Sequence, residues 1–413
     1  MQDFLPPAGG RMRALYDAAS NLAEMYGYRY VETPEVEHTE LFLRTSGETS
    51  DVVSKEMYTF ADRGGRSVTL RPEGTAPVMR AYLAHVQSQP SPFKTYYLTR
   101  MFRYGRPQRG RYREHRQFGI EIFGAEEPGA DVEVIAIGDR FLRDRGLSRF
   151  ELQINSIGDS VCRPAYRELL ISYLESRRSE LRDEHRDRFR DNPLRVLDCK
   201  DEACRAVSAE APKIVDHLCE PCGEHFDAVR AGLEEEGVRA VLRPTLVRGL
   251  DYYTRTAFEF ESEVLSEAQA TLFGGGRYDG LAEALGGPHV PGVGFGMGLE
   301  RVLIAMEDEG VDLPSERALD AFVIGVGEGR TSVRQVERTL REAGLSAMAE
   351  YADRPLKAQM RGADRAAARY VVIVGDQEAR AGTVTWKRLA DGVQLEGGID
   401  EAIAHMAARE DRG

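Results

Sequence analysis

The segment FKTYYLTRMFRYGRPQRGRYREHRQFGIEIFG, residues 93–124, consists of two β-rich runs separated by a loop of Arg, Gly and Pro. The runs contain the aromatic and β-branched residues that strands favour, and the loop at 105–111 contains turn formers. The segment therefore predicts a long antiparallel hairpin. Because side chains alternate along a strand, one face of the returning strand carries Arg113, His115, Gln117, Gly119 and Glu121.

This hairpin concentrates positive charge in an acidic chain. Seven arginines fall between residues 100 and 124, although the 413-residue chain has 55 Lys and Arg against 68 Asp and Glu, a net charge of −13. Arginine stays charged at any relevant pH and binds phosphate through two parallel N–H donors. A strand would hold Arg103 rigidly, as a reacting phosphate requires, while Arg109 and Arg111 on the loop would suit an incoming polyanion. A solvated charged hairpin would have the same composition, so other segments must decide.

The composition excludes several classes of protein. The negative net charge excludes a generally basic nucleic-acid coat, although it allows a local basic site. No stretch approaches the roughly 20 apolar residues of a membrane helix, and the N-terminal MQDFLPPAGG lacks the pattern of a signal peptide. Five cysteines, an odd number, fit a reducing compartment better than a disulfide framework. We expect a soluble cytoplasmic protein with no membrane partner.

The pattern of the chain predicts two domains. Residues 1–315 contain several short strands, including a hairpin at 57–74, with helices attached, so the fold class is α+β with a mostly antiparallel sheet. Residues 165–240 are dense in charge and poor in β-branched residues, which predicts a helical insertion with one polar helix over 172–191. Strands alternating with helices predict a compact α/β domain over residues 318–413.

The segment RPEGTAPVMRAY (71–82) places Glu73, Gly74 and Thr75 between a strand and a helix start. A carboxylate and a hydroxyl beside small residues can hold an ammonium group. Thr75 would serve equally well as an ordinary helix cap. The segment thus predicts either a binding site or a cap.

Three further segments combine glycine with charge or aromatic residues. LVRGLDYYTRTAFEF (246–260) runs into a strand, and its tyrosine pair predicts one ring on each face. GGGRYDGL (274–281) and GVGFGMGLERVLIAME (292–307) let a ligand approach the backbone closely, but they would also suit ordinary turns. The first of these segments contains the run Arg248-Gly249-Leu250-Asp251-Tyr252-Tyr253, and the third contains Arg301. Arg248, Asp251, the two tyrosines and Arg301 are the candidate site residues of these segments.

The cysteines present a separate choice. Cys199-x4-Cys204 and Cys219-x2-Cys222 have spacings found in zinc sites, but they are looser than a paired CxxC motif. Reduced thiols within a helical insertion are the favoured interpretation, so no metal is assigned. Cys162 is expected to be a plain core cysteine.

Together these segments resemble the class II aminoacyl-tRNA synthetases, and within them the histidyl-tRNA synthetases. GYRYVETPEVEHTELFLRTSGE is similar to the first class II motif, FRYGRPQRGRYREHRQFGIEIFG to the second, and GVGFGMGLERVLIAM to the third. LVRGLDYYTRTAFEF and GGGRYDGL match the two histidine-specific signatures. DAFVIGVGE, LKAQMRGADRAAARYVVIVG and GTVTWKRL resemble the family's anticodon-binding domain. The resemblance covers nearly the whole chain.

The resemblance implies a histidine–tRNA ligase. Such an enzyme uses ATP to convert L-histidine to histidyl-adenylate, with Mg²⁺ on the outer phosphates, and transfers histidine to the 3′ end of tRNA(His). Arg103 matches the arginine that binds the ATP α-phosphate and the histidine carboxylate, and Arg248 matches a catalytic arginine that reaches the same phosphate. Arg111 and Arg301 match residues for the outer phosphates, and Gln108 and Arg109 match residues for the tRNA acceptor end. The matches in the histidine pocket are Glu73, Thr75 and Gln117 for the α-amino group, with Gly74 between them, and Glu121 and Tyr253 for the imidazole, with Tyr252 beside them.

Two positions depart from the family pattern. Gly105 stands where a glutamate usually helps to hold adenine, and His115 stands where a phenylalanine is frequent, so an imidazole is expected to stack on adenine.

In the C-terminal domain, Trp386 with Lys387 and Arg388 is either an anticodon contact or a packing residue. By resemblance the first motif predicts a homodimer.

One alternative comes from a different class of protein. A non-catalytic synthetase-like regulatory subunit of ATP phosphoribosyltransferase, from histidine biosynthesis, has the same fold around the histidine site. Such subunits tend to lose the Arg-Gly-Leu-Asp-Tyr-Tyr signature and the anticodon-binding domain. Both features are present here, which favours the ligase.

Overall fold

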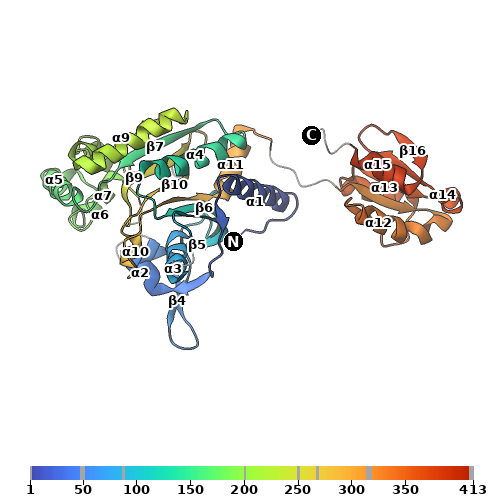
Figure 1. The fold of residues 1–413 in the computed structure, drawn as a ribbon, viewed down its shortest axis with the longest axis horizontal. Helices are drawn as coiled ribbons and strands as arrows, with labels where there is room; N and C mark the ends of the chain where they lie inside the picture. The colour runs from blue at the N-terminus through green and yellow to red at the C-terminus, as the bar shows by residue number, and fades with distance from the viewer. Residues whose placement is uncertain are drawn as a thin grey trace. The chain divides into compact units, whose positions relative to one another are not determined.

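A computed structural model describes residues 2–46, 52–85, 89–199, 201–248, 252–266, 269–312 and 319–408. The chain forms two compact units, residues 1–314 and 315–413, each of which is considered by itself (Figure 1). Gly249 and Asp251, the end of the segment resembling the first class II motif, and residues 313–318 between the units lie outside the described residues.

The first unit is built on an eight-stranded sheet with the order β1-β5-β6-β11-β10-β9-β7-β8. The predicted hairpin is its longest feature: β5 (Phe93–Phe102) pairs antiparallel with β6 (Glu114–Phe123) from Phe93↔Phe123 to Phe102↔Glu114. Only the pairs β1–β5 and β7–β8 of this sheet are parallel. The expected α+β class with an antiparallel sheet is therefore confirmed. The other strands are β1 (Arg29–Tyr30), β7 (Phe150–Ser156), β8 (Ala240–Leu242), β9 (Thr254–Ser262), β10 (Thr271–Arg277) and β11 (Gly292–Gly298).

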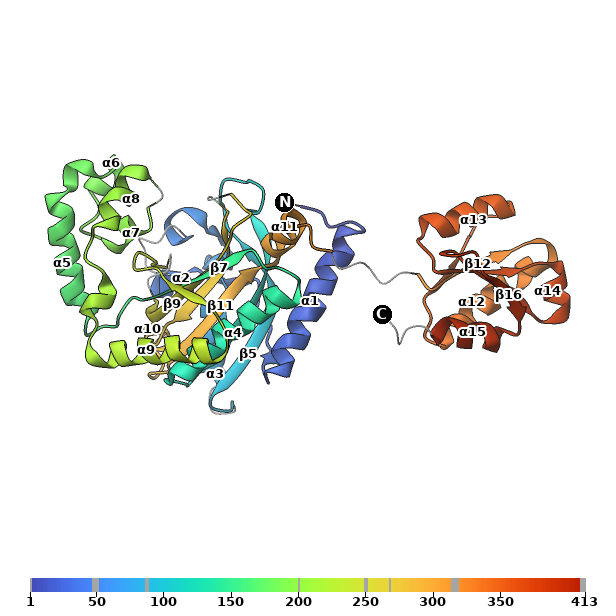
Figure 2. The ribbon, with the colours of Figure 1, turned by 90° about the horizontal axis from the view of Figure 1, so that it is seen from above.

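Long helices cover one face of this sheet. Helices α1 (Ala8–Met25), α4 (Pro128–Asp144) and α11 (Leu299–Glu309) contribute their apolar faces to one large core with β5, β6, β9, β10 and β11 (Figure 2). Leu15, Ile135 and Leu299 within it are fully buried. Burying apolar surface stabilises the fold by about 25 cal/mol per Å², so this packing fixes the sheet and leaves its opposite face for other elements.

Smaller elements border the opposite face. A three-stranded sheet with the order β2-β4-β3 consists of β2 (Val36–His38), β3 (Tyr58–Ala61) and β4 (Ser67–Leu70). The β3–β4 pair is the hairpin predicted at 57–74. The helices here are α2 (Thr39–Ser46), the short π-helix η1 (Val52–Glu56), α3 (Thr75–His85) and α10 (Leu281–Ala284).

The predicted insertion is helical, but its polar helix is broken. Helix α5 (Arg163–Ser176) ends where the expected helix over 172–191 should continue, and a 3-10 turn η3 (Arg178–Glu180) and α6 (Asp183–Arg186) follow. The chain turns there because Leu181 and Phe189 both reach the core, which a straight helix in solvent would not allow. The rest comprises α7 (Leu194–Leu197), α8 (Glu202–Ala209), η4 (Ile214–His217) and α9 (Glu220–Glu235).

The second unit is the expected α/β fold with a mixed five-stranded sheet in the order β13-β12-β14-β15-β16. Trp386 is only 4 % exposed and packs in the core of this unit, so it is a packing residue and no surface for stacking bases. The strands are β12 (Ala321–Gly325), β13 (Ala347–Ala349), β14 (Tyr370–Val374), β15 (Val384–Arg388) and β16 (Gln394–Gly397). The helices are η5 (Gly327–Ser332), α12 (Val333–Glu342), α13 (Leu356–Arg365), α14 (Asp376–Ala381) and α15 (Ile399–Ala407).

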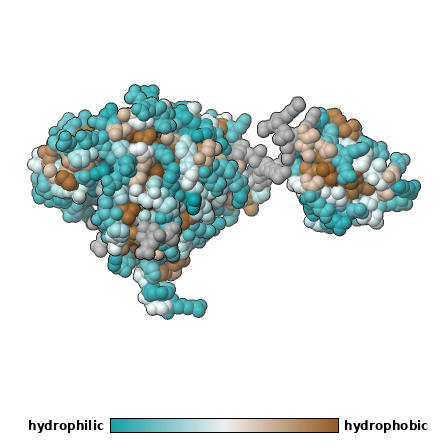
Figure 3. Space-filling view, viewed as in Figure 1, coloured by the Kyte–Doolittle hydropathy of each residue, from teal (hydrophilic) through white to brown (hydrophobic). Residues whose placement is uncertain are grey.

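The surface is largely hydrophilic on the face drawn in Figure 3, with hydrophobic residues in separate small patches. Among the described residues, every helix is too short or too polar to span a lipid bilayer.

Candidate active site

A cavity of about 360 Å³ opens in the first unit above the glycine-bearing strands β10 and β11. Its walls come from the β4–α3 connection, β5 and β6, the loop between them, the segment before β9, and the start of α11. Segments far apart in sequence therefore meet at one place. The predicted site residues that line it are Glu73, Gly74, Thr75, Arg103, Arg111, His115, Gln117, Arg248, Tyr252, Tyr253 and Arg301.

Glu73 forms an acidic wall of the cavity and also caps α3. Its carboxylate accepts hydrogen bonds from the backbone N–H of Thr75 at 2.7 Å and of Ala76 at 3.1 Å. Burial raises the pKa of Glu73 to about 7, although these two hydrogen bonds oppose the shift. The helix cap is thus Glu73 and not Thr75, which leaves the Thr75 hydroxyl free for another role.

That hydroxyl binds the second carboxylate of the site. Thr75 Oγ1 donates to Glu121 Oε1 at 2.8 Å, and the phenol of Tyr97 donates to the same oxygen at 3.3 Å. The phenol of Tyr278 donates to the other oxygen. Glu121 is fully buried, and burial raises its pKa to about 8 despite the hydrogen bonds from Tyr278, Thr75 and Tyr97. Glu121 therefore lies directly behind the cavity wall and is held by three hydroxyl groups.

Tyr97 and Tyr278 are site residues that the sequence alone did not identify. Tyr278 lies in the quoted segment GGGRYDGL, so its signal was a buried tyrosine that needs a partner for its hydroxyl. The Tyr97 ring covers two glycines: a Cβ at Gly74 would be 2.5 Å, and one at Gly119 2.1 Å, from Tyr97 Cζ. Small residues at 74 and 119 are what allow the Tyr97 hydroxyl to reach Glu121.

The tyrosine pair does not divide between two faces of a strand. Tyr252 and Tyr253 precede β9, are both buried, and have ring centroids only 4.7 Å apart. Alternation applies only within a strand, so the prediction of one ring on each face is wrong. Both rings line the cavity.

Arginines also line the cavity. Arg103 Nε donates to the carbonyl of Pro72 at 2.7 Å, and Arg301 donates to the carbonyls of Gly110 at 2.9 Å and Thr271 at 2.5 Å. Carbonyl partners fix both side chains without neutralising their charge. Burial, followed by the charges of Arg103 and Arg301, lowers the pKa of His115 to about 3, so its imidazole is neutral. The part of the cavity lined by Arg103 and Arg301 is therefore positive and suits a polyanion.

Two buried polar atoms of the lining residues have no partner among the described residues. They are Nε of Arg248 and Oε1 of Gln117. Arg248 Nη1 binds Glu259 Oε2 at 2.8 Å, which fixes its position. Buried polar groups are satisfied in native proteins, so these two atoms indicate a polar ligand.

The loop between β5 and β6 carries the remaining predicted residues. The side chain of Arg111 pairs with Glu56, a cavity carboxylate that the sequence did not identify. A Cβ at Gly105 would lie 2.9 Å from Arg111 Nε, so this glycine leaves room for the arginine. Arg109 lies outside the cavity lining and binds Asp308 through both terminal nitrogens, at 2.8 and 2.7 Å. Gln108 is likewise exposed.

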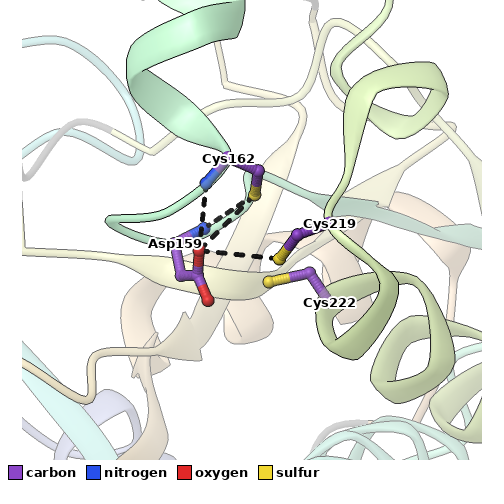
Figure 4. Close-up of side chains that lie close together, drawn as sticks. All are labelled: Asp159, Cys162, Cys219 and Cys222. Atoms are coloured by element: carbon purple, nitrogen blue, oxygen red, sulfur yellow. Dashed lines mark hydrogen bonds between the residues drawn. The ribbon is translucent and has the colours of Figure 1, made fainter.

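The cysteines fall into two groups. Cys199 and Cys204 lie with His185, whereas Cys219 and Cys222 lie with Asp159 and Cys162 (Figure 4). Among the described residues, no single zinc site is therefore built from all four of Cys199, Cys204, Cys219 and Cys222. Cys162 is buried as expected, but it belongs to a cluster of potential metal ligands.

Comparisons with known proteins agree with this arrangement. Residues 1–302 match the family model of histidyl-tRNA synthetase, and residues 320–409 match that of an anticodon-binding domain. The chain is 47% identical over 414 residues to a histidine–tRNA ligase of Moorella thermoacetica, covering 100% of this chain and 98% of the relative. It is 46% identical over 406 residues to that of Halothermothrix orenii, covering 98% and 97%.

A solved structure shows the same fold. The apo histidyl-tRNA synthetase of S. aureus superimposes with a TM-score of 0.82 at 37% identity, covering 98% of each chain. The match of the family model over most of the chain, with these near full-length relatives, establishes that this chain belongs to the histidyl-tRNA synthetase family.

Proposed function

We propose that the chain is a histidine–tRNA ligase that activates L-histidine with ATP and transfers it to the 3′ end of tRNA(His). The single observation that carries the proposal is the cavity itself. It is lined by the buried carboxylate of Glu73, with Glu121 directly behind its wall, and by Arg103 and Arg301, which have no carboxylate partner among the described residues. An amino acid with a cationic amino group and a triphosphate fit these two sets of residues.

Histidine would bind at the acidic side. Glu73, the Thr75 hydroxyl and Gln117 Oε1 accept hydrogen bonds and suit the ammonium group, while the Gly74 backbone allows close approach. Glu121, oriented by Thr75, Tyr97 and Tyr278, would select the imidazole together with Tyr252 and Tyr253. A pocket built to hydrogen-bond a ring nitrogen rejects side chains without one, because its buried polar groups would be left unpaired.

ATP would bind at the arginine side. Arg103 would contact both the attacking carboxylate and the α-phosphate, with Arg248 Nε on the same phosphate and Arg111 and Arg301 on the outer phosphates. The neutral imidazole of His115 would stack on adenine. The carboxylate of histidine attacks the α-phosphate, an acyl–phosphate bond forms, and pyrophosphate leaves. All reacting groups are anionic, so positioning and preorganised positive charge supply the rate enhancement.

A divalent ion fits this side of the cavity as well. The carboxylates that line it there are Glu56 and Glu300, and Glu300 is occupied by the backbone N–H and side chain of Arg116. Mg²⁺ needs only one or two protein carboxylates because phosphate and water oxygens complete its shell. Glu56 pairs with Arg111, a residue that would turn to the outer phosphates when ATP binds, so Glu56 is the residue that would hold Mg²⁺. The ion would neutralise charge on the outer phosphates.

The second step requires tRNA(His). We assign catalysis to a domain of residues 1–315, with the helical insertion inside it, and anticodon recognition to residues 318–413. The exposed Gln108 and the Arg109 held by Asp308 would meet the acceptor end. We place this reaction in the cytoplasm, where tRNA is charged.

We further propose a homodimer. Large apolar side chains are exposed in the segment from β1 to β3: Tyr30 at 51%, Val36 at 46% and Phe60 at 47%. Exposed apolar side chains that become buried between two copies of a chain stabilise a dimer. Light scattering coupled to size exclusion should give twice the mass of the chain, and a monomeric mass at micromolar concentration would contradict the proposal.

The test of the activity is ATP–pyrophosphate exchange without tRNA. Exchange should depend on histidine among the amino acids, and Arg248→Ala should abolish it while leaving the folded structure intact. Arg13→Ala, which changes an arginine exposed on α1, is the control and should leave the exchange rate unchanged. A folded protein that catalyses no exchange would instead indicate the regulatory-subunit alternative.

A further inference from the structure

Three thiols and one carboxylate converge outside the lining of the cavity. The ligand atoms of Asp159, Cys162, Cys219 and Cys222 all lie within 4.8 Å of one another (Figure 4). Asp159 and Cys162 come from the loop between β7 and α5, and Cys219 and Cys222 come from the start of α9. All three cysteines are free thiols.

The two pairs have the same spacing and the same local setting. Asp159-x2-Cys162 directly precedes α5, and Cys219-x2-Cys222 spans the first turn of α9. Two residues between ligands is the spacing typical of structural zinc sites. Asp159 stands at the position that a cysteine would occupy in a paired CxxC site.

The loop before α5 is wrapped closely around the sulfur of Cys162. Gly158 has φ +64°, and a Cβ there would lie 2.6 Å from Cys162 Sγ. The backbone N–H of Asp159 donates to this sulfur at 3.4 Å, and the N–H of Val161 donates to Asp159 Oδ1 at 2.9 Å. These donors fix both side chains and stabilise the negative charge that metal-bound ligands carry.

A second layer of contacts supports the cluster. Arg255 Nη2 lies 3.9 Å from Asp159 Oδ2, and the backbone of Arg255 bonds to that of Gly158 at 2.7 Å and of Ile157 at 2.8 Å. Three thiolates and a carboxylate carry four negative charges, of which a divalent ion neutralises two. The guanidinium of Arg255 offsets part of the remainder.

The distances suit a single ion. Zinc binds sulfur at about 2.3 Å and carboxylate oxygen at about 2.0–2.2 Å, so tetrahedral ligand atoms lie roughly 3.5–3.8 Å apart. The four ligand atoms here lie at most 4.8 Å apart, so any two of them need to approach each other by only about 1 Å to bind one ion. Soft thiolates select zinc over magnesium or calcium, and four protein ligands leave no open position for catalysis.

We propose that Asp159, Cys162, Cys219 and Cys222 bind one structural zinc ion. The ion ties the start of α9, at the end of the helical insertion, to the loop where the insertion begins. This tie lies behind the candidate histidine pocket, because Arg163, the residue after Cys162, donates to the backbone carbonyl of Tyr253 at 2.6 Å. The site thus fixes the insertion onto the sheet that carries the pocket.

The other group provides a matched control. His185, Cys199 and Cys204 supply three ligand atoms within the same distance limit, so their cysteines are removed first. The parent for the test is full-length protein carrying Cys199→Ser and Cys204→Ser, purified without a metal-affinity step from zinc-supplemented cells. Elemental analysis should find about one zinc per chain in this parent. Adding Cys219→Ser and Cys222→Ser should reduce the zinc content to nearly zero.

X-ray absorption of the parent covers the case in which the serine variant fails to fold. It should show about three sulfur ligands and one oxygen ligand around zinc. Three outcomes would overturn the proposal: a zinc-free parent, zinc retained after the Cys219 and Cys222 substitutions, or an absorption spectrum without sulfur ligands. A disulfide between Cys219 and Cys222 in anaerobically isolated protein would overturn it as well.

Discussion

At the scale of single residues, the site depends on two buried carboxyl groups that lack a cation. Among the described residues, neither Glu73 nor Glu121 forms an ion pair, and both are held by neutral N–H or O–H donors. Burial raises the pKa of Glu73 to about 7 and that of Glu121 to about 8. Near neutral pH both carboxyl groups are therefore partly protonated, and an arriving ammonium group favours their charged forms.

This gives a pH-dependent prediction. At pH about 7.5, where the imidazole of free histidine is mostly neutral, histidine binding should release protons. The sign follows because the ammonium group favours the charged carboxylate of Glu73 and lowers its pKa on binding, so the complex holds fewer protons than the empty site. Calorimetry in two buffers of different ionisation enthalpy measures this release. Glu73→Gln should reduce it, and a binding enthalpy independent of buffer would contradict the assignment.

A substitution at the second carboxylate tests selection of the side chain. Glu121→Gln keeps the size of the side chain but replaces a carboxyl oxygen by an amide NH2 group, and leaving a buried imidazole N–H without its acceptor costs about 1–3 kcal/mol. The KM for histidine in pyrophosphate exchange should rise about 10- to 100-fold, with little change in the KM for ATP. Glu133→Gln is the control, since Glu133 pairs with Tyr28 and Lys94 away from the cavity. Equal effects of both variants would refute the role of Glu121.

At the scale of elements, the glycines of β11 make room for the binding residues of β6. These strands pair antiparallel, and a Cβ at Gly296 would lie 1.9 Å from Gln117 Nε2, while one at Gly294 would lie 2.0 Å from Glu121 Oε2. The glycines of this strand thus leave space for the side chains of β6, whether or not a ligand also contacts the strand.

Gly296→Ala should therefore displace the amide of Gln117 and weaken histidine binding. Loss of one well-placed hydrogen bond predicts about a tenfold rise in Kd. Gly280→Ala is the matched control, because a Cβ there meets no atom within 4 Å. Fluorescence or calorimetric titration of both variants distinguishes the cases. An unchanged Kd for Gly296→Ala would show that Gln117 does not contact histidine.

Sequence patterns predicted the elements better than the contacts between them. The hairpin of β5 and β6 and the insertion followed from alternation, turn residues and charge density. The residues that other segments contribute to the site could not be predicted in this way. Tyr97 and Glu56 line the cavity because of the tertiary fold, and no local sequence pattern marks them. The grouping of the cysteines likewise depends on how the insertion is packed. Cys219 and Cys222 lie with Asp159 and Cys162, and not with the other cysteines of the insertion.

At the scale of the whole molecule, the chain separates into two compact units with their own cores. We expect residues 1–314 alone to retain histidine-dependent pyrophosphate exchange, with KM values within a fewfold of those of the full chain. Charging of tRNA should fall about 100-fold or more, because roughly 3 kcal/mol of tRNA-binding energy is lost with the second unit. Undiminished charging by the shortened chain would contradict our assignment of the anticodon to residues 318–413.

The most direct test of the central claim is the complete reaction. Full-length protein, ATP, Mg²⁺ and a tRNA(His) transcript are incubated with radiolabelled histidine, and acid-precipitable label is counted. We predict that label accumulates on this tRNA, depends on ATP, is not supported by other amino acids, and is abolished by Arg248→Ala. Charging with a different amino acid, or none at all by a folded protein that binds histidine, would contradict the account.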